Sequence, residues 1–333
     1  MNAIWWILIG VGSILAAGWI GLERGIRPRK STLAFWRLSS IPIGKKIEGY
    51  IYAARTSWYL KPAAWKRFAE RLDSRTGAEG YHGKVLTGND AIRLIRLQQP
   101  LAFTCPDQVL PFQRARELIR SQPLDSIAVL RCPCREQREQ PCTPLEVCLV
   151  LGEPFVSFIL DHQPDKARRI TPGEAEAILV AEEERGHIHT AWFKDAMHDR
   201  FYAICNCCRC CCLGMESYRR GVPRLVTSGY QPIMQREDCI GCGCCVEICP
   251  FAAWRQNPDE PPQLDRERCL GCGLCVGHCP GQALQLCLTP EQGQPLPLTQ
   301  CSEQTGRENS GQAIAEMFAK SSHIGHTFAK SSL

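Results

Sequence analysis

The chain has 333 residues, of which 44% are hydrophobic and 22% charged, and its formal net charge is +5 at pH 7. These values are typical of globular protein, and the length predicts two or three folded units, because single cores rarely exceed about 250–300 residues. Much of the basic excess follows an apolar N-terminus, so it indicates membrane topology and argues against a nucleic-acid-binding surface.

The first predicted element is a transmembrane helix at 3–22, a run of twenty residues without a charge. Such a helix is about 30 Å long, enough to cross the hydrocarbon core. A cleavable signal peptide is the alternative, but the basic residues follow the run instead of preceding it. The positive-inside rule therefore predicts a single-pass anchor in the inner (cytoplasmic) membrane, with the soluble part in the cytoplasm, where thiols stay reduced.

Residues 23–100 are predicted to be a helical linker region. Pro62 begins a stretch that predicts a helix through about Leu72, and a second helix is expected to start near Asn89 or Asp90. The region contains no recognisable set of metal ligands.

Residues 101–225 alternate between helical and strand patterns and predict a small α/β cysteine-rich domain. A helix is expected at 110–122 and another after Thr171, which with Glu174 forms a capping box, with Gly186 just past its end. Short apolar runs predict strands at 126–132, 154–160, 187–193 and 200–205.

Cysteines are concentrated in this domain. Ten of the 22 in the chain form a possible further metal site: Cys132, Cys134, Cys142, Cys148, Cys205, Cys207, Cys208, Cys210, Cys211 and Cys212. If the chain turns helical from Cys205, three of these thiols share one face. Zinc and a cubane each take four ligands, so one site cannot use all ten. A third iron–sulfur cluster is the favoured hypothesis, and a structural zinc or thiols used in redox chemistry or metal delivery are the alternatives.

Four nearby polar residues have two interpretations each. His187 and His189 are two apart on a predicted strand and could reach a metal, although a hydrogen-bonded or surface pair is the simpler interpretation. Arg135 and Arg209 flank the cysteines and could offset thiolate charge, or lie in solvent.

The strongest signal is a repeat at an offset of thirty residues in the C-terminal third. Four cysteines of the first copy align with four of the second, and Pro250 aligns with Pro280. The aligned pairs are Cys239 with Cys269, Cys242 with Cys272, Cys245 with Cys275, and Cys249 with Cys279. Zinc is the alternative ligand, but the duplicated spacing makes it a poor explanation.

Residues 230–288 resemble the bacterial-type ferredoxin domain that holds two [4Fe–4S] clusters in a (βαβ)2 fold. In that family the fourth cysteine of each motif ligates the other cluster. The resemblance therefore assigns cluster 1 to Cys239, Cys242, Cys245 and Cys279, and cluster 2 to Cys269, Cys272, Cys275 and Cys249. Cys244 is an extra thiol, and Cys287 and Cys301 lie outside the motif.

The preceding cysteine-rich domain resembles that of uncharacterised bacterial and archaeal 4Fe–4S-binding proteins, a resemblance that transfers no activity. Residues 289–333 contain the segment FAKSS twice and are predicted to be a largely disordered tail. The fold class expected for the whole chain is α+β: an anchor, a small α/β domain and a ferredoxin-like domain.

The expected function is that of a membrane-anchored iron–sulfur protein that relays single electrons between redox partner proteins, with no catalytic residue of its own and no nucleic acid as partner. A reductase with an active-site cluster in the cysteine-rich domain is one alternative. A redox sensor or metal-trafficking protein is the other, although the sequence has no DNA-binding signature.

Overall fold

The computed structural model describes residues 18, 19, 21, 23, 25, 27–61, 81–96, 126–198, 200–257, 260–293, 295 and 296. All of them belong to one unit of the chain, Met1–Leu296. Most of the predicted transmembrane helix, the predicted helices after Pro62 and at 110–122, and the predicted disordered tail beyond residue 296 lie outside these residues. Among the helices that are described, none is long and apolar enough to cross a membrane.

The main element is a sheet of seven strands with the order β4-β2-β3-β6-β5-β1-β7. Every neighbouring pair is antiparallel except β1 and β7. The strands are β1 (Tyr81–Leu86), β2 (Ile127–Arg131), β3 (Glu146–Leu151), β4 (Ala167–Ile170), β5 (Ile188–Lys194), β6 (Arg200–Cys207) and β7 (Leu225–Val226). The predicted strands at 126–132, 187–193 and 200–205 are confirmed as β2, β5 and β6.

Two expectations about this part of the chain need correction. The apolar run at 154–160 is the helix α10 (Phe155–His162) and not a strand. Its buried residues recur with helical spacing, which a short apolar run cannot reveal in advance: Phe155, Val156, Phe158, Ile159 and His162. The region 23–100 is also not only helical, because it supplies β1, which pairs with β5 near one edge of the sheet.

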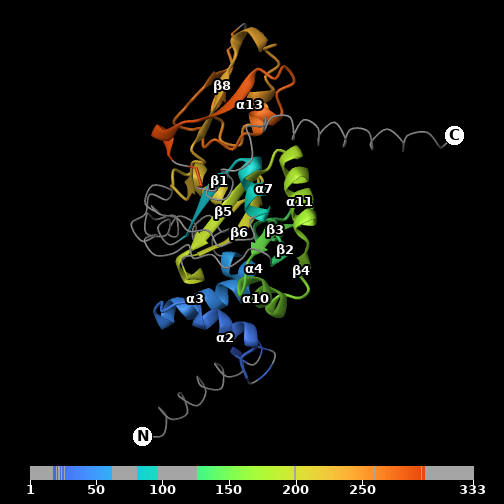
Figure 1. Cartoon of the computed structure of the whole chain (residues 1–333), viewed down its shortest axis with the longest axis vertical. Coiled ribbons are helices and arrows are strands. Elements are labelled where there is room, and N and C mark those ends of the chain that lie inside the picture. The colour runs from blue at the N-terminus through green and yellow to red at the C-terminus, as the bar shows by residue number, and fades with distance from the viewer. Residues whose placement is uncertain are drawn as a thin grey trace, which may run out of the picture. The chain divides into compact units, whose positions relative to one another are not determined.

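Helices lie on both faces of the sheet (Figure 1). On one face α7 (Gly88–Arg96) packs against α11 (Pro172–Glu184), and the other face is covered by α3 (Ile43–Ala54), α4 (Thr56–Leu60) and α10. The remaining helices are α2 (Lys30–Arg37), which packs on α10, α9 (Pro133–Glu136) and α12 (Leu213–Arg219), with a 3₁₀ turn at Asp195–Met197.

The two predicted helix starts that lie within the described residues agree with the structure. Thr171 caps α11 by accepting a hydrogen bond from the backbone N–H of Glu174 at 3.2 Å, and Gly186 follows the helix in a left-handed conformation. The carboxylate of Glu174 pairs with Arg168 at 2.6 Å. The helix expected near Asn89 is α7.

Buried polar contacts join the N-terminal segment to the sheet domain. Glu23 is 2% exposed, and its carboxylate accepts hydrogen bonds from the hydroxyls of Tyr50 at 2.7 Å and Thr32 at 2.9 Å. The Nε2 atom of His162 in α10 lies 3.1 Å from the same carboxylate. Residue 23, next to the predicted anchor, is thereby fixed to the folded body.

The C-terminal part consists of two small βαβ units that are joined by pairing between their outer strands. β8 (Tyr230–Met234) pairs antiparallel with β11 (Leu284–Leu288), so the first and last strands of the repeat are neighbours. Between them lie a 3₁₀ turn at Arg236–Asp238, α13 (Cys244–Ile248), β9 (Trp254–Arg255), β10 (Gln263–Leu264) and α14 (Leu274–Gly277), and a further 3₁₀ turn at Pro290–Gln292 follows β11. β9 pairs antiparallel with β10. This arrangement agrees with the expected (βαβ)2 pattern.

Candidate metal centres

The sequence repeat is also a repeat of backbone conformation. Gly241 and Gly271 both have a φ of 68°, and Gly243 and Gly273 follow with 74° and 86°. Thirty residues also separate Ala252 and Gln282, two non-glycine residues with φ near +50°. Glycine adopts such angles without a steric penalty, and these turns wrap the backbone around the cysteines of each copy. A Cβ on Gly271 would lie 2.0 Å from the carbonyl oxygen of Tyr230, so only glycine fits there.

The first thiol set, defined as Cys239, Cys242, Cys245 and Cys279, lines one small cavity of about 20 Å³. Three of its members come from the first copy of the repeat, and the fold brings Cys279 to them from the second copy. Cys242 is exposed, Cys239 and Cys279 are half-buried, and Cys245 is buried.

The second thiol set is Cys249, Cys269, Cys272 and Cys275. Burial raises the pKa of Cys272 well above its usual range, and negative charge on the other three adds to the effect. Burial also raises the pKa of Cys269 to about 11 and that of Cys275 to about 12. Cys269, Cys272 and Cys275 therefore favour the protonated thiol in the bare chain, and a metal cation that displaces the protons stabilises their thiolates. The donor set therefore fits an iron–sulfur cluster.

Hydrogen bonds to sulfur already exist at the second set. The backbone N–H of Ala253 donates to the Sγ atom of Cys249 at 3.3 Å, and the side chain of Trp254 hydrogen-bonds to Cys275. Such bonds are one of the means by which proteins tune cluster potentials. Of the spare cysteines, Cys244 hydrogen-bonds to Cys242, Cys287 lies half-buried in β11, and Cys301 lies outside the described residues.

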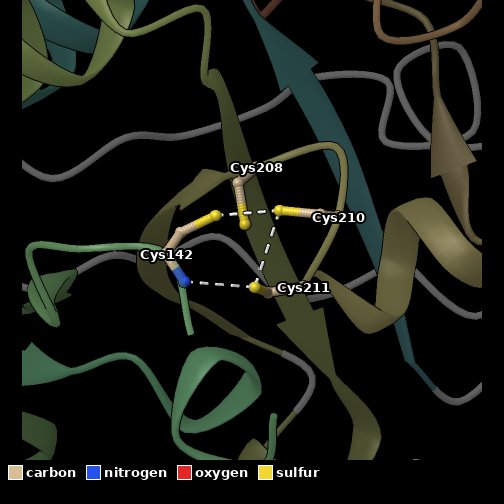
Figure 2. A group of neighbouring side chains, drawn as sticks. All are labelled: Cys142, Cys208, Cys210 and Cys211. Atoms are coloured by element: carbon tan, nitrogen blue, oxygen red, sulfur yellow. Dashed lines mark hydrogen bonds between the residues drawn. The ribbon is translucent and has the colours of Figure 1, made fainter. Parts of the chain in front are cut away.

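Four of the ten cysteines in the sheet domain form a compact group, shown in Figure 2. This four-thiol group consists of Cys142, before β3, and Cys208, Cys210 and Cys211, in the turn between β6 and α12; their sulfurs all lie within 4.8 Å of one another. The Sγ atoms of Cys142 and Cys210 are 2.8 Å apart, and those of Cys210 and Cys211 are 3.6 Å apart. The backbone N–H of Cys142 donates to the sulfur of Cys211 at 3.5 Å.

The other six cysteines lie together elsewhere. This six-thiol group lines a cavity of about 290 Å³ on the α3–α4 face of the sheet, and Cys208 of the four-thiol group also reaches its wall. Its members are Cys132, Cys134, Cys148, Cys205, Cys207 and Cys212. The helix considered from Cys205 onward is not formed, because Cys205 and Cys207 lie in strand β6 and a turn separates them from α12. The ten thiols therefore form two groups: four gather at the turn that follows β6, and six line the cavity on the α3–α4 face of the sheet.

Arg135 connects the two groups from within the core. It is 0% exposed, and its guanidinium forms an ion pair with Glu182 in α11 at 2.5 Å. It also donates to the carbonyl oxygens of Pro144 and Asn206, close in sequence to Cys142 and Cys208. Burial opposes its charge, but the hydrogen bond and the negative charge of Glu182, with charge on nearby thiols, together outweigh burial and raise the pKa of Arg135. Of the two predicted roles, the solvated one does not fit this buried residue, and the charge that it pairs with is the carboxylate of Glu182.

The two histidines are hydrogen-bonded. His187 Nδ1 lies 2.7 Å from the carboxylate of Glu182, and His189 Nδ1 lies 2.6 Å from the Oδ1 atom of Asn206. The simpler interpretation of the pair therefore fits the structure. Arg209 lies in the exposed turn between the cysteines, and its carbonyl oxygen accepts a hydrogen bond from Arg219 at 2.6 Å.

Sequence reasoning missed the polar wall of the larger cavity. Tyr52, Tyr81 and Tyr202 line it together with Lys194. The hydroxyls of Tyr52 and Tyr202 are 2.7 Å apart, and the Lys194 ammonium lies 5.5 Å from the centre of the Tyr52 ring and 2.7 Å from the Glu48 carboxylate. These residues are scattered over 150 positions of the chain and share no motif, so only the fold reveals them.

Comparison with known protein families identifies a 4Fe–4S dicluster domain at residues 238–284. The match contains all eight cysteines of the two copies but leaves out β8 and most of β11, and it implies two [4Fe–4S] clusters. The cysteine-rich region upstream adds the four-thiol group, which can hold a further cluster or a metal ion. No curated protein matches the chain.

Proposed function

We propose that this protein relays single electrons through two [4Fe–4S] clusters, held by the first and second thiol sets, between redox partner proteins. The observation that carries the proposal is the dicluster domain, whose fold gathers three cysteines of one copy with one of the other around a common cavity. When bound, such clusters supply reversible one-electron chemistry. The chain's own contribution is to hold the sulfurs, exclude water and donate N–H bonds to them.

The two ends of the relay differ in exposure. In the first set Cys242 is exposed, and its neighbour Ile240 is 67% exposed, whereas Cys249, Cys269 and Cys275 of the second set are buried. Electron exchange with a soluble partner therefore takes place at the first set.

The second set faces the cysteine-rich part of the chain. Tyr218 in α12 donates its hydroxyl hydrogen bond to the carbonyl oxygen of Arg268 at 3.0 Å, and its ring packs edge-on against Phe251 at 5.3 Å between centroids. Helix α12 begins directly after Cys212 of the six-thiol group. A short stretch of packed chain thus links the second set to the thiols of the sheet domain.

The four-thiol group is best suited to a single tetrahedral ion. Zinc–sulfur bonds of about 2.3 Å place the four sulfurs about 3.8 Å apart, and the group's sulfurs lie within 4.8 Å of one another. The ligands of a cubane bind four different irons and are spread further apart. A structural zinc at this position fixes the turn that leads from β6 into α12.

The charge-free run at 3–22 is proposed to anchor the chain in the inner membrane with the body in the cytoplasm. The run has the length of a membrane span, and basic residues follow it. Glu23 at its end is fixed by buried hydrogen bonds to Tyr50 and Thr32, so the anchor is held to the body without a flexible spacer.

The test is anaerobic purification followed by reduction with dithionite and electron paramagnetic resonance. The expected result is a spectrum of two magnetically interacting [4Fe–4S]⁺ clusters, which then lose their electrons to a soluble one-electron acceptor. The variant Cys242→Ser is expected to lose one of the two signals, whereas Cys244→Ser keeps both. A chain with eight irons whose clusters cannot be reduced, or cannot pass electrons on, would contradict the proposal.

A further inference from the structure

The six-thiol group extends across three neighbouring strands of the sheet. Cys132 follows β2, Cys148 lies in β3 opposite Leu130, and Cys205 lies in β6 beside β3. Because side chains alternate along a strand, Cys205 and Cys207 point to the same face. Cys134 in α9 and Cys212 at the start of α12 complete the group from above that face.

The six sulfurs form one continuous network of contacts. The Sγ atoms of Cys148 and Cys205 are 3.9 Å apart. Cys132 hydrogen-bonds to Cys148 and Cys134, and Cys212 to Cys134 and Cys207. All six are free thiols, and a thiol is a weak donor and a weak acceptor. Such a network adds little to stability, but it is a dense set of soft ligands of the kind that iron–sulfur clusters use.

The volume of the cavity favours a metal cluster over a single metal ion as its ligand. All six thiols, together with Cys208 of the four-thiol group, line about 290 Å³, close to the lower end of small-molecule sites, which measure about 300–1,000 Å³. A single tetrahedral ion occupies only the space between its four ligands, as in the four-thiol group. A space of this size lined by six thiols fits a polynuclear cluster, which takes four cysteines and leaves two to spare.

Polar groups also line the cavity. Lys194 is one of them: its side chain is only 7% exposed, and its ammonium pairs with the Glu48 carboxylate at 2.7 Å. Burial raises the pKa of Tyr52, so this hydroxyl stays a hydrogen-bond donor inside the cavity.

We propose that the six-thiol group binds a third [4Fe–4S] cluster inside this cavity, at a site separate from the four-thiol group. The inference rests on the proposed function, because a buried cluster on the α12 side serves the chain only if electrons reach it from the dicluster domain. The chain then carries about twelve irons and one further ion in the four-thiol group.

The experiment counts iron, acid-labile sulfide and zinc per chain in the full-length protein after anaerobic purification. The triple variant Cys132→Ser, Cys148→Ser, Cys212→Ser leaves three thiols of the six-thiol group, too few for a cubane with four cysteine ligands, while Cys208, which also lines the cavity, stays with the four-thiol group. It is expected to lose about four irons and four sulfides while keeping the zinc and the dicluster resonance spectrum. The control is the double variant Cys244→Ser, Cys287→Ser, which keeps all of them.

Retention of about eight irons and of the zinc shows that the triple variant is folded. A wild-type chain with about eight irons, or a triple variant that keeps about twelve, overturns the third cluster and leaves the proposed function standing. If Cys208→Ser removes four irons instead of the zinc, the third cluster belongs to the four-thiol group and the inference is also overturned. A wild-type chain without the dicluster spectrum refutes the proposed function itself.

Discussion

Replacing Glu182 with glutamine is expected to destabilise the sheet domain and loosen the four-thiol group. The variant leaves the guanidinium of Arg135, which is 0% exposed, without its counter-ion 2.5 Å away. Breaking a buried ion pair from one side costs about 3–5 kcal/mol. Glutamine keeps the volume and can still accept one hydrogen bond, so we expect about 3 kcal/mol, roughly a hundredfold change in the unfolding equilibrium.

The assay is urea unfolding followed by circular dichroism, together with zinc retention. For an unfolding slope of about 3 kcal/mol/M, the midpoint falls by about 1 M. Zinc retention falls with it, because Arg135 donates to Pro144 and Asn206 beside the cysteines of the four-thiol group. Glu184→Gln, an exposed neighbour on the same helix, is the matched control and leaves the midpoint unchanged. Equal midpoints for the two variants would refute the argument that Arg135 depends on this carboxylate.

Three further predictions concern the repeat, the pH dependence and the exposed ion. Gly271→Ala is expected to lower the iron content by about four per chain, because the added Cβ would lie 2.0 Å from the carbonyl oxygen of Tyr230. The control Gly241→Ala has the same φ of 68° but no atom within 4 Å of its added Cβ, so this variant keeps its iron. Equal iron losses in the two variants would exclude the clash as the cause. Burial lowers the pKa of His198 to about 4 from the usual 6.5 of a histidine. The folded state therefore binds fewer protons than the unfolded chain between these values, so stability falls by up to about 3 kcal/mol as pH drops from about 6.5 to 4. Denaturant midpoints at several pH values should show this dependence in the wild type and a smaller one in His198→Asn, whose side chain tolerates the observed φ of 61°. Because Cys210 is exposed, a zinc chelator should remove one zinc per chain without bleaching the iron–sulfur absorbance; co-release of iron would show that the four-thiol group does not hold zinc.

The structure was most predictable from the sequence where cluster ligands recur at a fixed spacing. The offset of thirty residues in the cysteine repeat reappears in backbone angles at Gly241 and Gly271, because the same wrapping turn is needed in each copy. Strands β5 and β6 were predictable from their β-branched and aromatic residues. The run after Pro154 was not, because a short and mostly apolar run fits a buried strand and a buried helix equally well.

The division of the ten thiols into two groups could not be read from the sequence. It depends on β6 ending at Cys207, so that Cys205 and Cys207 stay on the sheet face while Cys208 enters the turn. It also depends on the pairing of β3 with both β2 and β6, which places Cys148 between Cys132 and Cys205. Strand order and register are long-range properties that local patterns do not specify.

The duplicated backbone of the dicluster domain has an electrical consequence. Two halves with the same turns at the same offsets give the two proposed clusters the same local backbone, so the turns by themselves do not make their reduction potentials differ. A difference in potential must come from the greater burial of the second thiol set and from positions at which the copies differ, such as Glu247 against Gly277 or Cys244 against Leu274. Exchanging those side chains between the halves should change the difference in potential while leaving the positions of the clusters unchanged.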